Sequence, residues 1–161
     1  IDITKNSPAI PGVVHGDFCL SNILFDSRCD RIKVIDPRGM TAKGRLTIYG
    51  DLRYDLAKLT HSIVGLYDHI VAGAYDVGLH TEAGNKAFTL QIHVDQRTKL
   101  IQQTFIKRTF LQDITTSEAI SHAILLFLSM LPLHTDDNNR QLAFLANALR
   151  LYCDINTLIE A

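Results

Sequence analysis

The spacing of apolar residues divides the chain into a short part with the pattern of strands and a longer part with the pattern of helices. In the first part, short apolar runs alternate with polar turns, which predicts strands over residues 12–15, 22–25 and 31–35. Residues 26–30 are rich in turn-forming side chains and predict a hairpin between the second and third strands. The basic, glycine-flanked segment 41–49 is predicted to be a loop. The first part therefore predicts a small platform of strands.

From Asp51 onwards the apolar spacing changes to that of a helix. Apolar residues recur at alternating intervals of four and three, which predicts one helix of about five turns with a single apolar stripe. The stripe consists of Leu52, Leu56, Leu59, Ile63, Leu66 and Ile70. Segment 73–84 contains three glycines and is predicted to be a loop. The alternation of apolar and polar residues over 88–94 predicts a half-buried strand.

Three more helices are predicted in the rest of the chain, the first over residues 96–112. Thr115 and Glu118 fit a capping box, in which each side chain satisfies a backbone N–H of the other residue. The helix that this box opens is apolar nearly all round. At about fifteen residues it is too short and too polar to span a bilayer, so we predict a central core helix. Asp136 or Asp137 is expected to cap the last helix, whose apolar stripe ends at Tyr152.

The composition is that of an ordinary globular protein of one domain, residues 1–161. The chain has 161 residues, of which 47% are hydrophobic and 20% charged. A formal net charge of -1, without a strongly basic run, gives no reason to expect nucleic acid or a membrane as a partner. The three cysteines are scattered and form no CxxC motif, which favours a reduced, cytoplasmic setting. The predicted class is α+β, mainly α.

Polar residues with a common chemistry stand at the ends of the predicted strands. Asp17, Asn22 and Asp36 place two carboxylates and an amide where strands meet loops, the usual position of a site on a rigid frame. Oxygen ligands of this type suit a hard cation such as Mg²⁺ bound together with phosphates. Asp17 taken alone would be a turn residue that bonds its own backbone. Its spacing from the other two favours a functional role.

The same residues resemble a known active-site signature. The run His15-Gly16-Asp17, with Asn22 five residues after Asp17 and Asp36 ending the next strand, resembles the signature of the aminoglycoside phosphotransferase and choline kinase group. These small-molecule kinases have a protein-kinase-like fold. The resemblance implies the C-terminal lobe of that fold, with a small β-hairpin platform and about four to five helices. Segment 54–57, Tyr-Asp-Leu-Ala, is similar to an Asp-hydrophobe-Ala element of the group.

The resemblance also implies a role for each motif residue. Asp17 would be the catalytic base that accepts the proton of the attacking hydroxyl. Asn22 and Asp36 would be the metal ligands that hold Mg²⁺ against the phosphates of ATP or GTP. His15 and Asp55 would support the catalytic loop. The acceptor would be a hydroxyl of a sugar, an aminosugar or an amino alcohol.

Two further residues near the motif have competing interpretations. Arg38, like Lys43, is either a contact for substrate or phosphate, or a solvated loop residue. Cys19 stands where Ser/Thr protein kinases have a lysine, which is consistent with the small-molecule branch. A Cys-His nucleophile made of Cys19 and His15 finds no support, because no third residue that would orient the pair is evident. The remaining histidines are expected on the surface or as satisfied core residues.

The first twelve residues are too few for the N-terminal lobe of this fold, which supplies a glycine-rich loop and a strand lysine paired with a helix glutamate. We therefore expect the chain to be part of a longer protein and to be inactive in isolation. An exposed cleft face also predicts pairing into a homodimer through that face. Two functions remain open: the catalytic lobe of a small-molecule kinase, or a non-catalytic kinase-like binding or regulatory module.

Overall fold

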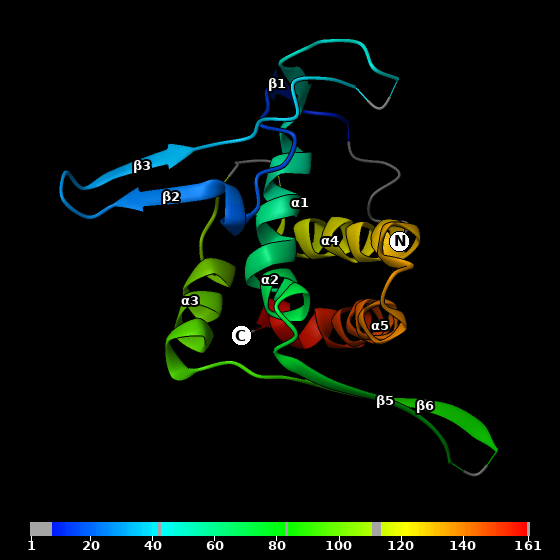
Figure 1. Cartoon of the computed structure of the whole chain (residues 1–161). Helices are drawn as coiled ribbons and strands as arrows, with labels where there is room; N and C mark the ends of the chain where they lie inside the picture. The colour runs from blue at the N-terminus through cyan, green and yellow to red at the C-terminus, as the bar shows by residue number, and fades with distance from the viewer. Residues whose placement is uncertain (1–7, 42, 83, 111–113, 161) are drawn as a thin grey trace.

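The computed structural model describes residues 8–41, 43–82, 84–110 and 114–160, and it is an α+β structure dominated by helices. Within these residues, five α-helices form the body and three two-stranded antiparallel sheets extend from it (Figure 1). The helices are α1 (Leu52–Ile63), α2 (Tyr67–Val71), α3 (Gln96–Ile106), α4 (Thr116–Met130) and α5 (Asn138–Glu160). The strands are β1 (Pro11–Val13), β2 (Ile23–Asp26), β3 (Arg31–Val34), β4 (Tyr49–Asp51), β5 (Tyr75–Glu82) and β6 (Asn85–Ile92). Two short 3-10 helices, η2 (Leu20–Asn22) and η3 (Leu131–His134), complete the elements.

The predicted hairpin is the antiparallel pair β2–β3, which runs from Ile23 opposite Val34 to Asp26 opposite Arg31. The first predicted strand is also present, as β1. Its partner β4 was not predicted, because Tyr49 was assigned to the end of a loop. Because Tyr49 pairs with β1, it belongs to a strand. The other described residues of segment 41–49 contain no strand and form a loop, as predicted. This β1–β4 pair leads directly into α1.

The loop prediction for segment 73–84 was wrong, because β5 occupies most of it. β5 pairs with β6 along its whole length, from Tyr75 opposite Ile92 to Glu82 opposite Asn85. The glycines that suggested a loop stand mainly at its ends, where Gly73 and Gly84 have positive φ angles of 75° and 83° and turn the chain. The strand predicted over 88–94 is confirmed as β6, with shifted bounds.

The single helix predicted over residues 52–70 is broken into α1 and α2. Gly65 is the cause, since a Cβ atom on it would lie 2.5 Å from the ring of Phe127 in α4. Leu66 then adopts a left-handed φ of 57°, and α2 starts in a new direction. Asn147 of α5 fixes this bend by donating a hydrogen bond from Nδ2 to the Gly65 carbonyl at 2.7 Å. Leu66 and Ile70 are nevertheless buried, as the stripe predicts.

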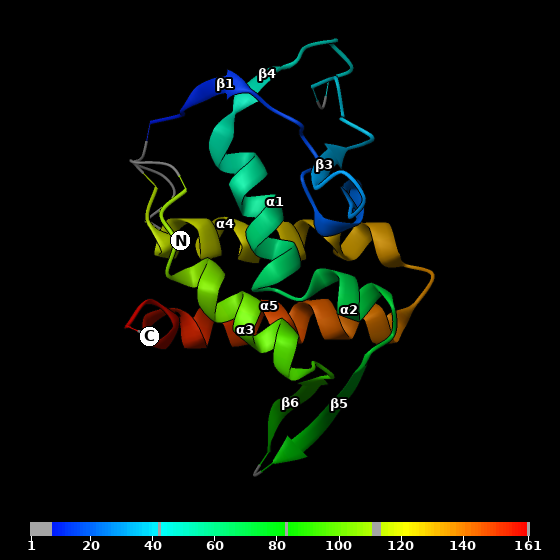
Figure 2. The ribbon, with the colours of Figure 1, turned by 90° about the vertical axis from the view of Figure 1, so that its left-hand side faces the viewer.

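The core lies between α2, α4 and α5, together with Val64 directly after α1. In Figures 1 and 2, α4 and α5 run beside each other and α1 stands across them. Ile120 and Phe127 of α4 are fully buried, which confirms the predicted core helix. Among the described residues, the structure has no helix with the length and apolar character that crossing a membrane requires.

The predicted helix ends are largely present. The Thr115 side chain accepts a hydrogen bond from the Glu118 N–H at 3.1 Å, and Asp137 caps α5 by accepting from the Arg140 N–H at 3.0 Å. The Glu118 carboxylate accepts from Arg53 Nη1 at 3.2 Å and so links α4 to α1. One length was wrong, because α3 ends at Ile106 instead of reaching residue 112, which itself lies outside the described residues. The last helix, α5, extends to Glu160, beyond the end of its predicted apolar stripe at Tyr152.

Candidate active site

The predicted catalytic segment, residues 15–17, is a turn held in place by α1. The Asp55 carboxylate accepts a hydrogen bond from the His15 N–H at 2.6 Å and another from the Gly16 N–H at 2.8 Å. Gly16 has a positive φ of 79°, so this turn needs a residue without a Cβ atom. Asp51 caps α1 by accepting from the Arg53 N–H at 3.1 Å, and this cap sets the first turn of the helix beneath the segment. Asp55 therefore braces the turn, as expected.

His15 connects this turn to the end of the β2–β3 hairpin. Its Nδ1 accepts a hydrogen bond from the Asp17 N–H at 3.3 Å, and its Nε2 lies 2.9 Å from the Ile35 carbonyl oxygen. Because Nδ1 accepts, the proton is on Nε2, which donates to Ile35. Both ring nitrogens are therefore used in holding the backbone, which is the structural role expected of His15.

Asp17, Asn22 and Asp36 come together at the base of the hairpin. The Asn22 amide donates from Nδ2 to the Asp17 carbonyl oxygen at 2.9 Å and lies 3.4 Å from Asp17 Oδ2. The Asn22 carbonyl accepts from the Ile35 N–H at 3.0 Å, so Asn22 stands opposite the residue that precedes Asp36. Asp36 has a left-handed φ of 56°, uncommon for a residue with a side chain. The turn of residues 15–17 and the two ends of the hairpin thus meet at one place.

The donor set at this place suits a magnesium ion held together with phosphates. The Asp36 side chain is exposed and has no protein partner among the described residues. The Asn22 side-chain oxygen accepts no hydrogen bond from them either, whereas the Asn22 NH₂ group is used on Asp17. No group of three or more His, Cys, Asp or Glu side chains that could hold a metal occurs in the described part. Mg²⁺ is commonly bound by one or two protein oxygens, with phosphates and water completing the octahedron.

Lys58 is a site residue that sequence reasoning missed. Its Nζ lies 2.7 Å from Asp17 Oδ1, and its side chain is 11% exposed while that of Asp17 is 33% exposed. Lys58 follows Asp55 by three residues, so both side chains lie on the face of α1 that meets the turn. That spacing was the signal available in the sequence. The ion pair offsets the charge of Asp17. Among the described residues, its Oδ2 has only the longer contact with Asn22 Nδ2, at 3.4 Å, whereas its Oδ1 is paired with Lys58.

Arg38 lies against the same turn, beside a pocket of about 200 Å³. Its backbone N–H donates to the His15 carbonyl at 2.8 Å. Its guanidinium carbon lies 5.3 Å from the centre of the Tyr54 ring. The residues around the pocket include His15, Gly16, Arg38, Thr47, Tyr49 and Tyr54. Sequence reasoning named Arg38 as a contact for substrate or phosphate and gave neither Tyr49 nor Tyr54 a role in the site.

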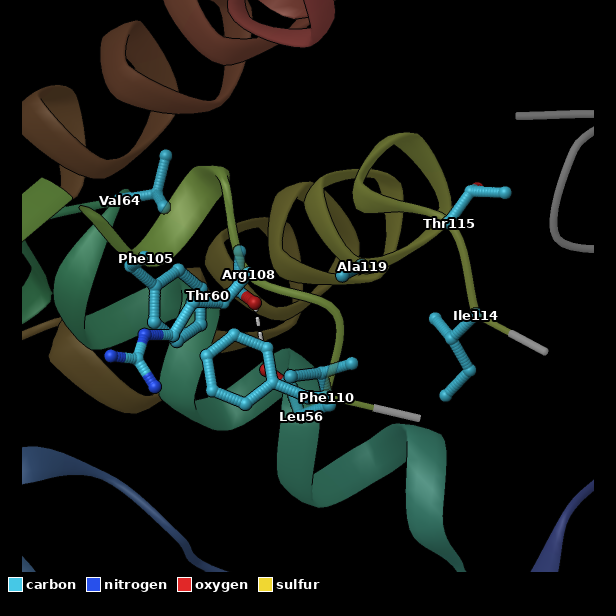
Figure 3. A pocket seen from close by; sticks show the side chains of 9 residues that line it. All are labelled: Leu56, Thr60, Val64, Phe105, Arg108, Phe110, Ile114, Thr115 and Ala119. Carbon is cyan, nitrogen blue, oxygen red and sulfur yellow. Dashed lines mark hydrogen bonds between the residues drawn. The ribbon is translucent and has the colours of Figure 1, made fainter. Parts of the chain in front are cut away.

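A second, smaller cavity lies between α1, α3 and α4 (Figure 3). Its volume of about 20 Å³ is close to that of one water molecule. Within it, Thr60 Oγ1 donates a hydrogen bond to the Leu56 carbonyl at 2.8 Å. The surrounding side chains are mainly apolar, among them Phe105, Phe110 and Ile114. This cavity is too small for a substrate, whereas the larger hollow beside Arg38 is lined by His15 and Gly16, the two residues that precede Asp17.

Two other side chains near the turn, those of Cys19 and His61, are buried in the protein interior. Cys19 is buried, and its Sγ lies 3.6 Å from the Asp17 carbonyl oxygen and 3.2 Å from Ser21 Oγ. His61 is fully buried, and neither ring nitrogen has a hydrogen-bond partner among the described residues. Burial lowers the pKa of His61 to about 3. The expectation that core histidines are satisfied was therefore wrong for His61.

Comparison of the chain with protein-family models, with curated proteins and with solved structures found no match. A function is therefore proposed from the sequence motif and from the geometry of the site.

Proposed function

We propose that this chain is the catalytic lobe of a small-molecule kinase of the aminoglycoside phosphotransferase and choline kinase type. One observation carries the proposal: Asp17, Asn22 and Asp36 converge at the base of the β2–β3 hairpin. The bracing of the turn by His15 and Asp55 is consistent with a site whose geometry must be fixed before substrate arrives. In this proposal the helical body corresponds to the C-terminal lobe of a protein-kinase-like fold.

In the proposed reaction, an acceptor hydroxyl attacks the γ-phosphorus of ATP or GTP. A new O–P bond forms, the bond from the γ-phosphorus to the bridging oxygen breaks, and the nucleoside diphosphate leaves with the electron pair. Asp17 takes the hydroxyl proton, and Oδ2 is the oxygen that we assign to it because Oδ1 is paired with Lys58. Such transfer depends on positioning and on neutralising charge.

Asn22 and Asp36 are the residues that would hold Mg²⁺, through the amide oxygen and the carboxylate. When bound, the ion would neutralise phosphate charge and orient the nucleotide. The hairpin fixes the distance between the two ligands, because the Ile35 N–H donates to the Asn22 carbonyl at 3.0 Å. The acceptor class is a sugar, an aminosugar or an amino alcohol with a free hydroxyl.

A non-catalytic kinase-like binding or regulatory module is the second candidate. Apolar side chains on the β2–β3 hairpin are widely exposed, including Leu24 (48%), Phe25 (63%) and Ile32 (71%). Phe25 and Ile32 stand opposite each other in the hairpin and so share one of its faces, and exposed apolar surface of this kind is typical of protein contacts. Such a surface would serve a binding module, and it would also serve a homodimer formed through the cleft face.

Calorimetry of this chain with ATP or GTP separates the two candidates. The kinase proposal predicts nucleotide binding that requires Mg²⁺ and that weakens by at least ~10-fold in Asn22→Ala and in Asp36→Ala. Asn139→Ala, an exposed asparagine on α5, is the matched control and should bind as the wild type does. Absence of binding both in this chain and in a longer form that includes the N-terminal lobe, or equal binding with and without Mg²⁺, would favour the non-catalytic module.

Light scattering tests the pairing of two chains. We expect a dimer at high protein concentration, and we expect Phe25→Ser or Ile32→Ser to shift it towards the monomer because each removes exposed apolar area from the hairpin. Leu133→Ser, an exposed leucine in η3 that lies outside the hairpin, serves as the control. A wild-type monomer at the highest concentration measured would refute pairing through this face.

A further inference from the structure

Arg38 is an exposed arginine whose position is fixed. Its backbone N–H is bonded to the His15 carbonyl at 2.8 Å, and a Cβ atom at Gly16 would lie only 2.8 Å from its own Cβ. Its guanidinium stacks on the Tyr54 ring. Stacking occupies a face of the planar group and leaves the N–H donors at its edge available to a ligand. The structure therefore presents a fixed set of donors beside the candidate base.

The carboxylates around this pocket already have their own donors. Arg53 donates from Nε to both oxygens of Asp51, at 3.0 and 2.9 Å. Asp55 accepts two backbone N–H groups, and Asp17 is paired with Lys58. Arg38, in contrast, has no carboxylate partner among the described residues. Arg38 therefore lies at the pocket as a cation without an ion-pair partner, and the charges of the nearby Asp36 and Asp55 carboxylates are likewise not neutralised by a cation among the described residues.

Two further features determine the charge near the pocket, namely the carboxylate of Asp36 and the basic residues of segment 37–49. Asp36 is the nearby carboxylate without a partner, and the proposed function assigns it to Mg²⁺. Of the basic residues of segment 37–49, which supplies one side of the pocket, Arg38 lines the pocket, whereas Lys43 and Arg45 do not. At short range the Arg38 guanidinium attracts an oxyanion and repels the ammonium groups of aminosugars and amino alcohols.

The size of the pocket limits the ligand to a small molecule. Its volume of about 200 Å³ lies below the range of about 300–1,000 Å³ that is typical for drug-sized ligands. Thr41, Thr47, Tyr49 and Tyr54 add hydroxyl groups to its wall, which suits a hydroxylated ligand.

We propose that this pocket takes the phosphate acceptor, and that Arg38 binds it through an oxyanion, a carboxylate or a phosphate, that the acceptor carries. The inference rests on the proposed function, because it assigns the acceptor side of that reaction. Of the acceptor classes that the motif leaves open, it selects an acidic sugar or a sugar phosphate over a cationic aminosugar.

The test is a set of NMR titrations of this chain at constant ionic strength. The probes are three hexoses of similar size, namely glucuronate, glucose and glucosamine, together with inorganic phosphate. We expect glucuronate and phosphate to shift the backbone amides of Gly16, Gly39 and Gly50, which line the pocket, and glucosamine to leave them unchanged. The stronger of the two anions identifies the preferred oxyanion.

Two variants complete the test. Arg38→Ala should weaken binding of the anions by at least ~10-fold, the loss expected for a charge-assisted hydrogen-bonded contact. Arg45→Ala, an arginine of the same segment outside the pocket lining, should bind them as the wild type does. The amide spectrum of Arg38→Ala shows directly whether the variant is folded.

Several outcomes would overturn the inference. These are an equal response to glucosamine, no response to either anion, and an equal loss in Arg45→Ala, which would indicate diffuse charge. Shifts confined to Gln102 and Gln103 would place the anion in the hollow of about 410 Å³ beside Arg150. Displacement of phosphate by Mg²⁺-ATP would make Arg38 a nucleotide contact.

The proposed function can fail separately from this inference. Anion binding at Arg38 without Mg²⁺-dependent nucleotide binding would refute the kinase alone. Nucleotide binding with no preference for anionic acceptors would refute only the inference.

Discussion

Asp17→Ala is expected to lower the rate of Mg²⁺-dependent phosphoryl transfer by about 10²–10⁴-fold, the usual contribution of a general base. The reason is that the acceptor hydroxyl loses the group that takes its proton. The rate is measured by release of nucleoside diphosphate, on the shortest form of the protein whose wild type shows transfer. The substitution also has a second effect, on stability, because it leaves the ammonium group of Lys58, whose side chain is only 11% exposed, without its ion-pair partner.

Asp17→Asn separates the two effects. The amide keeps the shape of the side chain and still accepts a hydrogen bond from Lys58, but it cannot take the proton. We expect a loss of rate similar to that in Asp17→Ala, with a smaller loss of stability. Asp76→Asn is the control, because the Asp76 carboxylate also contacts a basic side chain, with Oδ2 2.8 Å from His93 Nε2, and Asp76 lies on the β5–β6 hairpin away from the site (Figures 1 and 2). Turnover at the wild-type rate in both Asp17 variants would reject Asp17 as the base.

Acidification from pH 7 to pH 4.5 is expected to lower the free energy of unfolding by roughly 3 kcal/mol through His61 alone. The ring is fully buried and packs between Tyr67 and Phe127, with ring centres 4.6 and 4.0 Å away. Burial is the main cause that lowers the pKa of His61 to about 3; the charge of Lys58 acts in the same direction, and that of Asp17 opposes it.

The sign follows from proton uptake. In the unfolded chain the pKa of His61 is near 6.5, so the unfolded state takes up a proton as the pH falls below this value, while the folded state stays neutral. The unfolded state is therefore favoured progressively from pH 6.5 down to about pH 3. Between pH 6.5 and pH 4.5 this amounts to about two pH units at 1.36 kcal/mol each.

His61→Leu tests this prediction. Leucine removes two buried nitrogens that have no hydrogen-bond partner among the described residues, so stability at pH 7 should be unchanged or higher. Urea unfolding at several pH values should show that roughly 3 kcal/mol of the pH dependence is lost in the variant. In the wild type, the His61 ring protons should not titrate by NMR between pH 7 and pH 4.5. A titration midpoint near 6.5 in the folded protein would contradict the prediction.

Local patterns predicted most of the secondary structure. The alternation and the turn residues of segment 22–35 were sufficient for the β2–β3 hairpin, because its strands pair with their immediate neighbours in sequence. Thr115 and Asp137 marked helix starts because a cap satisfies N–H groups only two or three residues away. The apolar run of α4 likewise predicted a core helix, in which Ile120 and Phe127 are fully buried while Leu125 and Leu128 lie at the surface.

The errors arose where contacts between distant residues overrule local preference. The glycines of segment 73–84 suggested a loop, but full-length pairing with β6 makes β5 a strand, and Tyr75 and Val77 pack against the core. The apolar stripe after Asp51 continues unbroken through Leu66. The break occurs because the Phe127 ring leaves no room for a side chain at Gly65.

For the candidate site, the sequence by itself determined which chemical groups are available: the carboxylates of Asp17 and Asp36, the amide of Asn22 and the guanidinium of Arg38. Only the tertiary structure decided which of the charged groups are paired. Asp17 is joined to Lys58, and the turn is joined to Asp55, across about forty positions of sequence. These bonds form because α1 packs against the turn, and no local pattern encodes that packing. It leaves the side chains of Asp36 and Arg38 without an ion pair or a hydrogen bond among the described residues, whereas two backbone N–H groups hold the Asp55 carboxylate.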